Sequence, residues 1–381
     1  MYVSDVLIFI LLIGIILGFL IYFITKLLLT IGVLNGKRYF MLVAYFFIIK
    51  LPNILHHKDR NCAEDIRKRR SFKKAPQQKD LTTYAISTEI IGNCPCRIYK
   101  PKQKTNDLLF VFIHGGGWCI LAPSDYDRLM DNFMLELNCT IVSIDYPLAP
   151  ENVFPAAINE CYNTIDTLMN SMEKIIGFNT TNCIIGGDSA GGCLTANMTQ
   201  RAAMNDKAWF KHQILIYPSL ISFNFNTPSY KNYFNTDIRS ILSPKSTANC
   251  YLMYFGIETT EKNRNELLNS DSLIPDTLRR ESPLHPFINN LEVSPILAEE
   301  ALLKKLPSSI TFLATADVLQ DEGFKYHMNL KKAARDDTSI CHDFHWIKNS
   351  SHGEVSFNKE AAFEMIKEIK YWLDKRGALA Y

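Results

Sequence analysis

The sequence predicts an α/β protein, in which a mostly parallel central sheet is flanked by helices and carries a cap, with a transmembrane helix at the N-terminus. Short apolar runs alternate with helix-length segments from residue 108 to residue 375. A polar stretch at residues 221–295 interrupts this alternation, and an uncharged run at residues 6–24 precedes it. The length of 381 residues and the hydrophobic content of 47% suffice for one large domain and a smaller subdomain.

The uncharged run at residues 6–24 has the length of a membrane anchor. A helix rises about 1.5 Å per residue and a bilayer core is about 30 Å thick, so nineteen residues nearly span it. Asp5 precedes the run and no small-residue cleavage site ends it, which favours a retained anchor over a cleaved signal peptide. We expect an anchor at residues 1–36, an interfacial or cap segment and connector at 37–80, and the main domain at 81–381.

The side of the membrane that the main domain occupies is open on these residues. Lys26, Lys37 and Arg38 follow the anchor, and the positive-inside rule would place the domain in the cytosol. Four acceptor sequons for N-glycosylation, which are used only in the lumen, begin at Asn138, Asn179, Asn197 and Asn349.

Charge and cysteine content exclude several classes of protein. The net charge is +2, from 41 basic and 39 acidic residues, so no nucleic-acid partner is indicated. The ten cysteines are scattered, and Cys94 and Cys96 lack a second ligand pair at zinc spacing. We therefore expect no dense disulfide framework and no metal.

The predicted elements follow one another in a regular order. Alternating patterns predict opening strands at 83–90 and 97–99. Continuous apolar runs predict buried strands at 108–113, 140–144, 183–185, 214–217, 310–315 and 341–347. Helical patterns lie at 126–137, 155–172, 194–204, 248–255, 323–334 and 359–375. The stretch at 221–295 is too long for an ordinary loop, and we expect it to form a lid over the strand ends.

Ser189 is the candidate nucleophile. It lies between Gly187 and Gly191, after an apolar run and before a helical pattern. This arrangement is typical of a strand-to-helix turn so sharp that flanking side chains would collide with the backbone, and it exposes the hydroxyl at the top of the sheet. A turn without chemistry would have the same pattern, so the assignment depends on a base, an acid and an anion site elsewhere in the chain.

A glycine-rich loop is the candidate anion site. The predicted strand at 108–113 ends in the sequence HGGGW at residues 114–118. Successive glycines leave backbone N–H groups unobstructed, and these can converge on the oxygen that becomes negative when an ester carbonyl is attacked. We expect the N–H groups of Gly115, Gly116 and Ala190 to form this oxyanion hole.

His352 and Asp317 are the candidate base and acid. His352 lies in a loop after the last predicted strand, where its ring can reach Ser189. Asp317 leaves the end of the preceding strand, and its rivals Asp321 and Glu322 are better placed to cap N–H groups at a helix start or to favour the helix dipole. The chain order of serine, aspartate and histidine is the order that an α/β-hydrolase sheet imposes.

With these motifs in this order, the chain resembles the hormone-sensitive lipase family of α/β-hydrolases, and within it the membrane-anchored arylacetamide deacetylase group. The residues that carry the resemblance are HGGGW at 114–118, DYPLAPE at 145–151, FPAA at 154–157, GDSAGG at 187–192 and DVLQDEG at 317–323. Asp188 stands before the serine as in this family, whereas cholinesterase-like enzymes usually have glutamate there. Three residues depart from the family pattern, namely Pro147, Val318 and Gln320. None is a triad position, so they bear on local packing and on which substrate shapes are accepted more than on activity.

The resemblance implies an ester or amide hydrolase of lipophilic substrates without a metal or organic cofactor, in the endoplasmic reticulum with a luminal body. We expect a Ser-His-Asp triad that works through an acyl-enzyme intermediate. The alternative is a hydrolase-like protein that binds a hydrophobic ligand without chemistry, which should lack a triad member. Membrane lipid is an expected partner through the anchor, and the sequence indicates no particular protein partner.

Overall fold

The computed structural model describes residues 79–103, 106–233, 242–276 and 278–379. The predicted anchor at 1–36, and all but the last two residues of the predicted segment at 37–80, lie outside these ranges. Among the helices of the described ranges, none combines the length and the hydropathy needed to span a bilayer.

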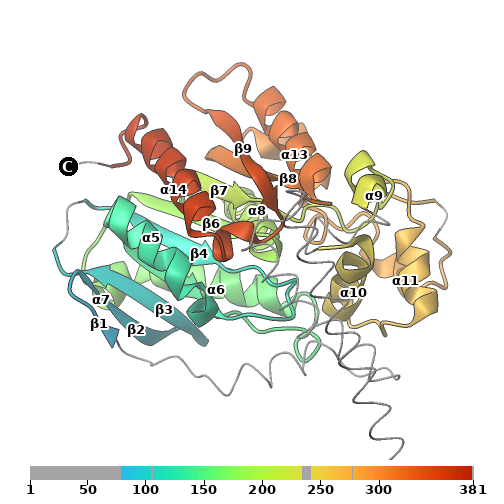
Figure 1. Cartoon of the computed structure of the whole chain (residues 1–381), viewed down its shortest axis with the longest axis horizontal. Coiled ribbons are helices and arrows are strands. Elements are labelled where there is room, and N and C mark those ends of the chain that lie inside the picture. Colours follow the sequence, from blue (N-terminus) through green and yellow to red (C-terminus); the bar gives the residue numbers. More distant parts are fainter. Residues whose placement is uncertain (1–78, 104–105, 234–241, 277, 380–381) are drawn as a thin grey trace, which may run out of the picture. The chain divides into compact units, whose positions relative to one another are not determined.

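The described residues form a nine-stranded sheet in the order β1-β2-β3-β5-β4-β6-β7-β8-β9 (Figure 1). The strands β1, β2, β3 and β5 pair antiparallel, and every pairing from β5 through β4 to β9 is parallel. The strands are β1 Lys79–Asp80, β2 Tyr84–Ile91, β3 Cys94–Pro101, β4 Leu109–Ile113, β5 Thr140–Ile144, β6 Cys183–Asp188, β7 His212–Ile216, β8 Ser308–Ala316 and β9 His342–Ser351. The predicted mostly parallel sheet is confirmed.

Helices cover the sheet, and α5 and α14 lie side by side on one face (Figure 1). The α-helices are α5 Asp127–Leu137, α6 Ala156–Asn170, α7 Met172–Ile176, α8 Ala190–Met204, α9 Pro228–Tyr233, α10 Pro244–Phe255, α11 Glu261–Leu268, α12 Glu300–Leu303, α13 Gln320–Ala333 and α14 Lys359–Asp374. Short 3-10 helices lie at Pro123–Tyr126, His285–Phe287, Pro295–Leu297 and Glu354–Ser356. The single helix predicted at 155–172 is divided between α6 and α7.

The central strand β4 explains why the strand signals are continuous apolar runs. Phe110 and Phe112 belong to the hydrophobic cluster that includes residues of α5 and α14. Leu109, Val111 and Ile113 belong to the cluster that includes residues of α6 and α8. Since successive side chains of a strand point to opposite faces, a strand covered on both faces is apolar at every position.

The segment at 221–295, which we call the lid segment, lies between β7 and β8 and contains α9, α10 and α11. The start of α10 is set by local chemistry, because the Ser243 hydroxyl accepts the Ser246 N–H and Pro244 occupies the first helical position. Gly256 ends this helix in the left-handed conformation at φ 75°. The predicted helix at 248–255 is therefore present and begins one turn earlier.

Candidate active site

Ser189 occupies a strained turn between β6 and α8. Its φ is 56° and its ψ is −119°, which few residues other than glycine adopt. A Cβ at Gly187 or at Gly191 would collide with the carbonyl oxygen of Ile113 at the end of β4. The turn therefore has the geometry predicted from the glycine spacing, and it lies against the end of the neighbouring strand.

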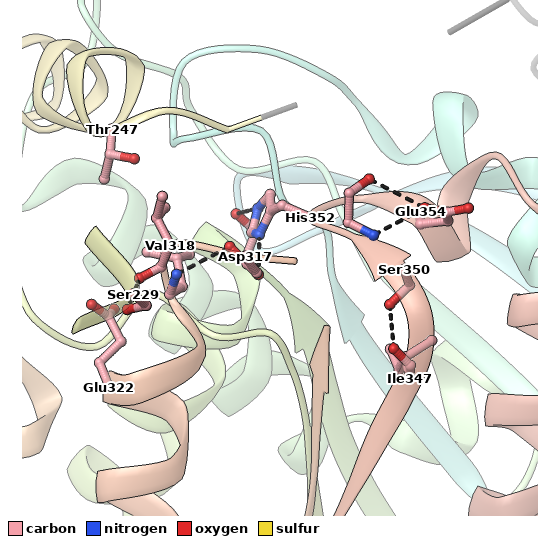
Figure 2. Close-up of polar contacts among 12 residues, drawn as sticks. Ser229, Thr247, Asp317, Val318, Glu322, Ile347, Ser350, His352 and Glu354 are labelled. Carbon is pink, nitrogen blue, oxygen red and sulfur yellow. Dashed lines mark hydrogen bonds and ion pairs between the residues drawn. The ribbon is translucent and has the colours of Figure 1, made fainter. Parts of the chain in front are cut away.

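The structure brings the predicted base and acid together with the serine. His352 Nε2 lies 2.8 Å from Ser189 Oγ. His352 Nδ1 lies 2.7 Å from Asp317 Oδ2 (Figure 2). The second Asp317 oxygen, Oδ1, accepts the backbone N–H of Leu319 at 3.0 Å. An ionised carboxylate can only accept, so Nδ1 carries the ring proton and Nε2 is left to accept the serine proton. Asp317 is fully buried, and its hydrogen bond to Nδ1 holds the ring in this orientation.

The glycine-rich loop differs in one respect from the sequence expectation. The Gly115 N–H is already donated, to Asp188 Oδ1 at 2.8 Å and to the Tyr126 hydroxyl at 3.0 Å. Three other backbone N–H groups donate to no acceptor within the described residues, namely those of Gly116, Gly117 and Ala190. The hydrogen bonds of Gly115 therefore argue against it as an oxyanion donor, and the loop offers Gly117 in its place.

Comparison with known proteins places this arrangement in a family. Residues 110–345 match the family model described as the alpha/beta hydrolase fold. The chain belongs to the α/β-hydrolase fold family. It is 30% identical to arylacetamide deacetylase of Bos taurus over 311 residues, which cover 71% of this chain and 75% of the relative. It is 28% identical to neutral cholesterol ester hydrolase 1 of Mus musculus over 306 residues, which cover 70% and 72%.

A solved structure agrees with the fold of this α/β-hydrolase. A thermostable esterase from Pseudomonas putida superimposes with a TM-score of 0.63 at 20% identity, over 84% of this chain and 91% of that one. The resemblance to the hormone-sensitive lipase family and its arylacetamide deacetylase group, predicted from the motifs, is confirmed.

Two buried side chains next to the glycine-rich loop of this α/β-hydrolase have shifted pKa values. Burial lowers the pKa of His114 to about 4, so its ring is neutral at neutral pH. Burial raises the pKa of Asp188 to about 6, against the lowering effect of the hydrogen bonds from Tyr126 and Gly115. From the sequence neither residue was expected to have a chemical role, although Asp188 directly precedes Ser189.

The two rival carboxylates have other partners. Asp321 Oδ2 accepts the backbone N–H of Ser229 at 2.7 Å. Glu322 Oε1 accepts the backbone N–H of Leu220 at 2.6 Å, and burial raises the Glu322 pKa well above its ordinary value. Both carboxylates lie in the first turn of α13. Asp321 binds Ser229 of the lid segment, and Glu322 binds Leu220 just before it. His352 pairs with Asp317 instead.

The lid segment also packs on the glycine-rich loop. The Trp118 ring stacks on the Tyr254 ring of α10 with centroids 4.5 Å apart and planes 9° apart. A Cβ on Gly117 would lie 2.5 Å from the Cys250 sulfur of the same helix. Helix α10 therefore leaves no room for a larger residue at this point of the loop.

Within the described ranges, no group of three His, Cys, Asp or Glu side chains could hold a metal ion.

Proposed function

We propose that the protein is a serine hydrolase that cleaves carboxylic esters or amides of lipophilic substrates through an acyl-enzyme intermediate. The observation that carries the proposal is the continuous contact from Ser189 through His352 to Asp317, at 2.8 Å and 2.7 Å. The relatives named as a deacetylase and as a cholesterol ester hydrolase support the reaction class and a lipophilic substrate.

In the proposed reaction, Ser189 Oγ attacks the carbonyl carbon while its proton passes to His352 Nε2. The carbonyl oxygen becomes an oxyanion, and the protonated imidazole is stabilised by Asp317. His352 then gives the proton to the leaving alcohol or amine, which departs and leaves an acyl-serine. Water, deprotonated by His352, attacks the acyl-serine, and the proton returns to Ser189 as the acid is released.

The oxyanion would be held by backbone N–H groups. We assign this role to Gly116 and Ala190, as expected from the sequence, and to Gly117 in place of Gly115. In the described part of the chain, the N–H groups of Gly116, Gly117 and Ala190 donate to no acceptor. The Gly115 N–H, in contrast, donates to two acceptors. Donors that are already oriented stabilise the developing charge without reorganising during the reaction.

The domain boundaries and the location remain part of the proposal. We assign residues 1–36 to a single membrane anchor, 37–80 to an interfacial segment and connector, and 81–381 to the catalytic domain with its lid. The body is assigned to the lumen of the endoplasmic reticulum, as a glycoprotein, because of the sequons and because the resemblance to the arylacetamide deacetylase group implies that location. The alternative of a ligand-binding protein without chemistry required a missing triad member, and all three side chains are present.

A substrate panel tests this function. Purified protein is assayed with p-nitrophenyl esters of increasing acyl length, with an arylacetamide and with an acylglycerol, and Ser189→Ala is the matched control. Hydrolysis by the wild-type protein and none by the variant supports the proposal, and the ratio of kcat/KM values identifies the preferred acyl group. Equal hydrolysis by both proteins contradicts it.

A further inference from the structure

Gly115 is held by side chains at both of its backbone polar groups. Its N–H donates to Asp188 Oδ1 at 2.8 Å. Its carbonyl oxygen lies 2.8 Å from His114 Nδ1 and 3.5 Å from the Tyr146 hydroxyl. A Cβ at this position would lie 2.7 Å from the Asp188 carboxylate, so only glycine fits. The residue that the glycine motif suggested as an anion donor is instead the fixed point of the loop.

Fixing the Gly115 carbonyl also fixes the next N–H. In a trans peptide the C=O of one residue and the N–H of the next point in opposite directions. Because the Gly115 oxygen faces the His114 ring, the Gly116 N–H points away from that ring. The ring is itself held, since it stacks on Tyr146 with centroids 4.4 Å apart. The direction of one proposed oxyanion donor is thus set by contacts that involve no substrate.

Asp188 connects this loop to the nucleophile. It is the last residue of β6, it directly precedes Ser189, and it is 3% exposed. One carboxylate oxygen accepts the Gly115 N–H, and the other accepts the Tyr126 hydroxyl at 2.9 Å. A buried carboxylate is costly unless it is hydrogen-bonded, and here both oxygens are. The side chain therefore joins two segments that are far apart in the chain.

We propose that Asp188, together with Tyr126, is a positioning residue that fixes the oxyanion hole relative to Ser189. The proposal rests on the proposed function, because a positioned anion hole matters only if an oxyanion forms. In this proposal the Gly115 N–H fixes the glycine-rich loop to Asp188 and does not bind the oxyanion. Neither Asp188 nor Tyr126 is assigned a contact with substrate.

The test separates stabilisation of the transition state from binding of the substrate. The variant is Asp188→Asn, whose amide oxygen can still accept the Gly115 N–H but whose NH2 group faces the Tyr126 hydroxyl. We measure kcat and KM on a p-nitrophenyl ester, and the inhibition constant of a trifluoromethyl ketone, which forms an oxyanion on the serine. Loss of one oxyanion donor costs about 100- to 1,000-fold in kcat, so a misplaced donor should cost about 10- to 100-fold.

The expected result is a kcat lowered by that factor, a KM within about twofold of wild type, and inhibitor binding weakened in parallel with kcat. Tyr126→Phe should change the same quantities in the same direction by less, and it decides the question if Asp188→Asn does not fold. Asp343→Asn is the matched control, since this carboxylate binds Trp372 and Arg376 away from the loop. It should leave kcat unchanged.

Two outcomes overturn the inference. One is a folded Asp188→Asn variant with wild-type kcat and inhibitor affinity. The other is an Asp188→Asn variant whose KM for the ester and inhibition constant for the ketone rise by the same factor. That result would indicate a merely structural role. Failure of the proposed function itself is distinguishable, because the wild-type protein would then neither hydrolyse the ester nor react with a fluorophosphonate.

Discussion

The Ser229 hydroxyl donates a hydrogen bond to the carbonyl oxygen of Val318 at 2.6 Å (Figure 2). Val318 follows Asp317, and Ser229 is the second residue of α9 in the lid segment. The Ser229 N–H also reaches Asp321, at 2.7 Å. Ser229 of the lid segment is therefore bonded through its hydroxyl to the loop that carries the proposed catalytic acid, and through its N–H to the first turn of α13.

Removing this hydroxyl should destabilise the protein. Ser229 is fully buried, so Ser229→Ala leaves the Val318 carbonyl oxygen without its donor, at a cost of about 1–3 kcal/mol in the free energy of unfolding. Ser229→Thr keeps a hydroxyl and should recover part of the loss. Urea unfolding followed by circular dichroism measures both. A loss below about 0.5 kcal/mol for Ser229→Ala would show that the bond contributes little.

Ionisation of Glu322 should destabilise the fold at high pH. Burial raises its folded pKa well above its ordinary value of 4.5, so its contribution to stability is present below pH 4.5 and is lost as pH rises through the folded pKa. Glu322→Gln keeps an oxygen that can accept the Leu220 N–H and cannot ionise. The free energy of unfolding of this variant relative to wild type should therefore rise from pH 5 to pH 8. A pH-independent difference would refute the shift.

Acid should destabilise the fold through a buried histidine of the sheet. Burial lowers the pKa of His342 from 6.5 to about 4, while His342 Nδ1 lies 2.8 Å from Ser309 Oγ. The neutral ring is favoured in the fold, so its contribution is present above pH 6.5 and is lost as pH falls toward about 4. The loss is about 3 kcal/mol for this residue. His342→Gln should show a shallower decline in unfolding free energy between pH 7 and pH 4, and an unchanged slope would contradict this.

The sequons differ in what the fold permits. Asn197 is 2% exposed within α8, and its side-chain amide donates to the Glu292 carbonyl oxygen at 2.9 Å, so a glycan there is incompatible with the fold. Asn179 and Asn349 are exposed. If the body is luminal, Asn179→Gln and Asn349→Gln should each remove one glycosidase-sensitive step in gel mobility, and Asn197→Gln none. Glycosidase resistance of the wild-type protein from cells would contradict the luminal assignment.

How far the sequence predicts the site depends on the range of the contacts. The proximity of Ser189, Asp317 and His352 could be predicted because each follows a strand, and strand order alone brings their side chains together at one edge of the sheet. The hydrogen bond from Gly115 to Asp188 could not be predicted, because the two residues lie 73 positions apart and a glycine motif contains no sign of such a bond.

In the lid segment, too, the elements that depend on long-range contacts could not be predicted from the sequence. The helix at 248–255 was predicted from its helix-like pattern, and the structure buries Ala248, Tyr251, Leu252, Tyr254 and Phe255 of this stretch. Helices α9 and α11 have only six and eight residues, and α11 buries Leu267 alone. Helices this short are marginal without tertiary contacts, so their own sequences give little signal. Their formation depends on contacts such as those of Ser229 with the acid loop.

Ser189 is proposed as a nucleophile that His352 activates. Mass spectrometry of the intact protein after reaction with a fluorophosphonate tests this proposal. We expect one phosphonate adduct on the wild-type protein, located on the peptide that contains Ser189, none on Ser189→Ala, and strongly slowed labelling of His352→Ala. An unlabelled but folded wild-type protein, or equal labelling of Ser189→Ala, would contradict the account.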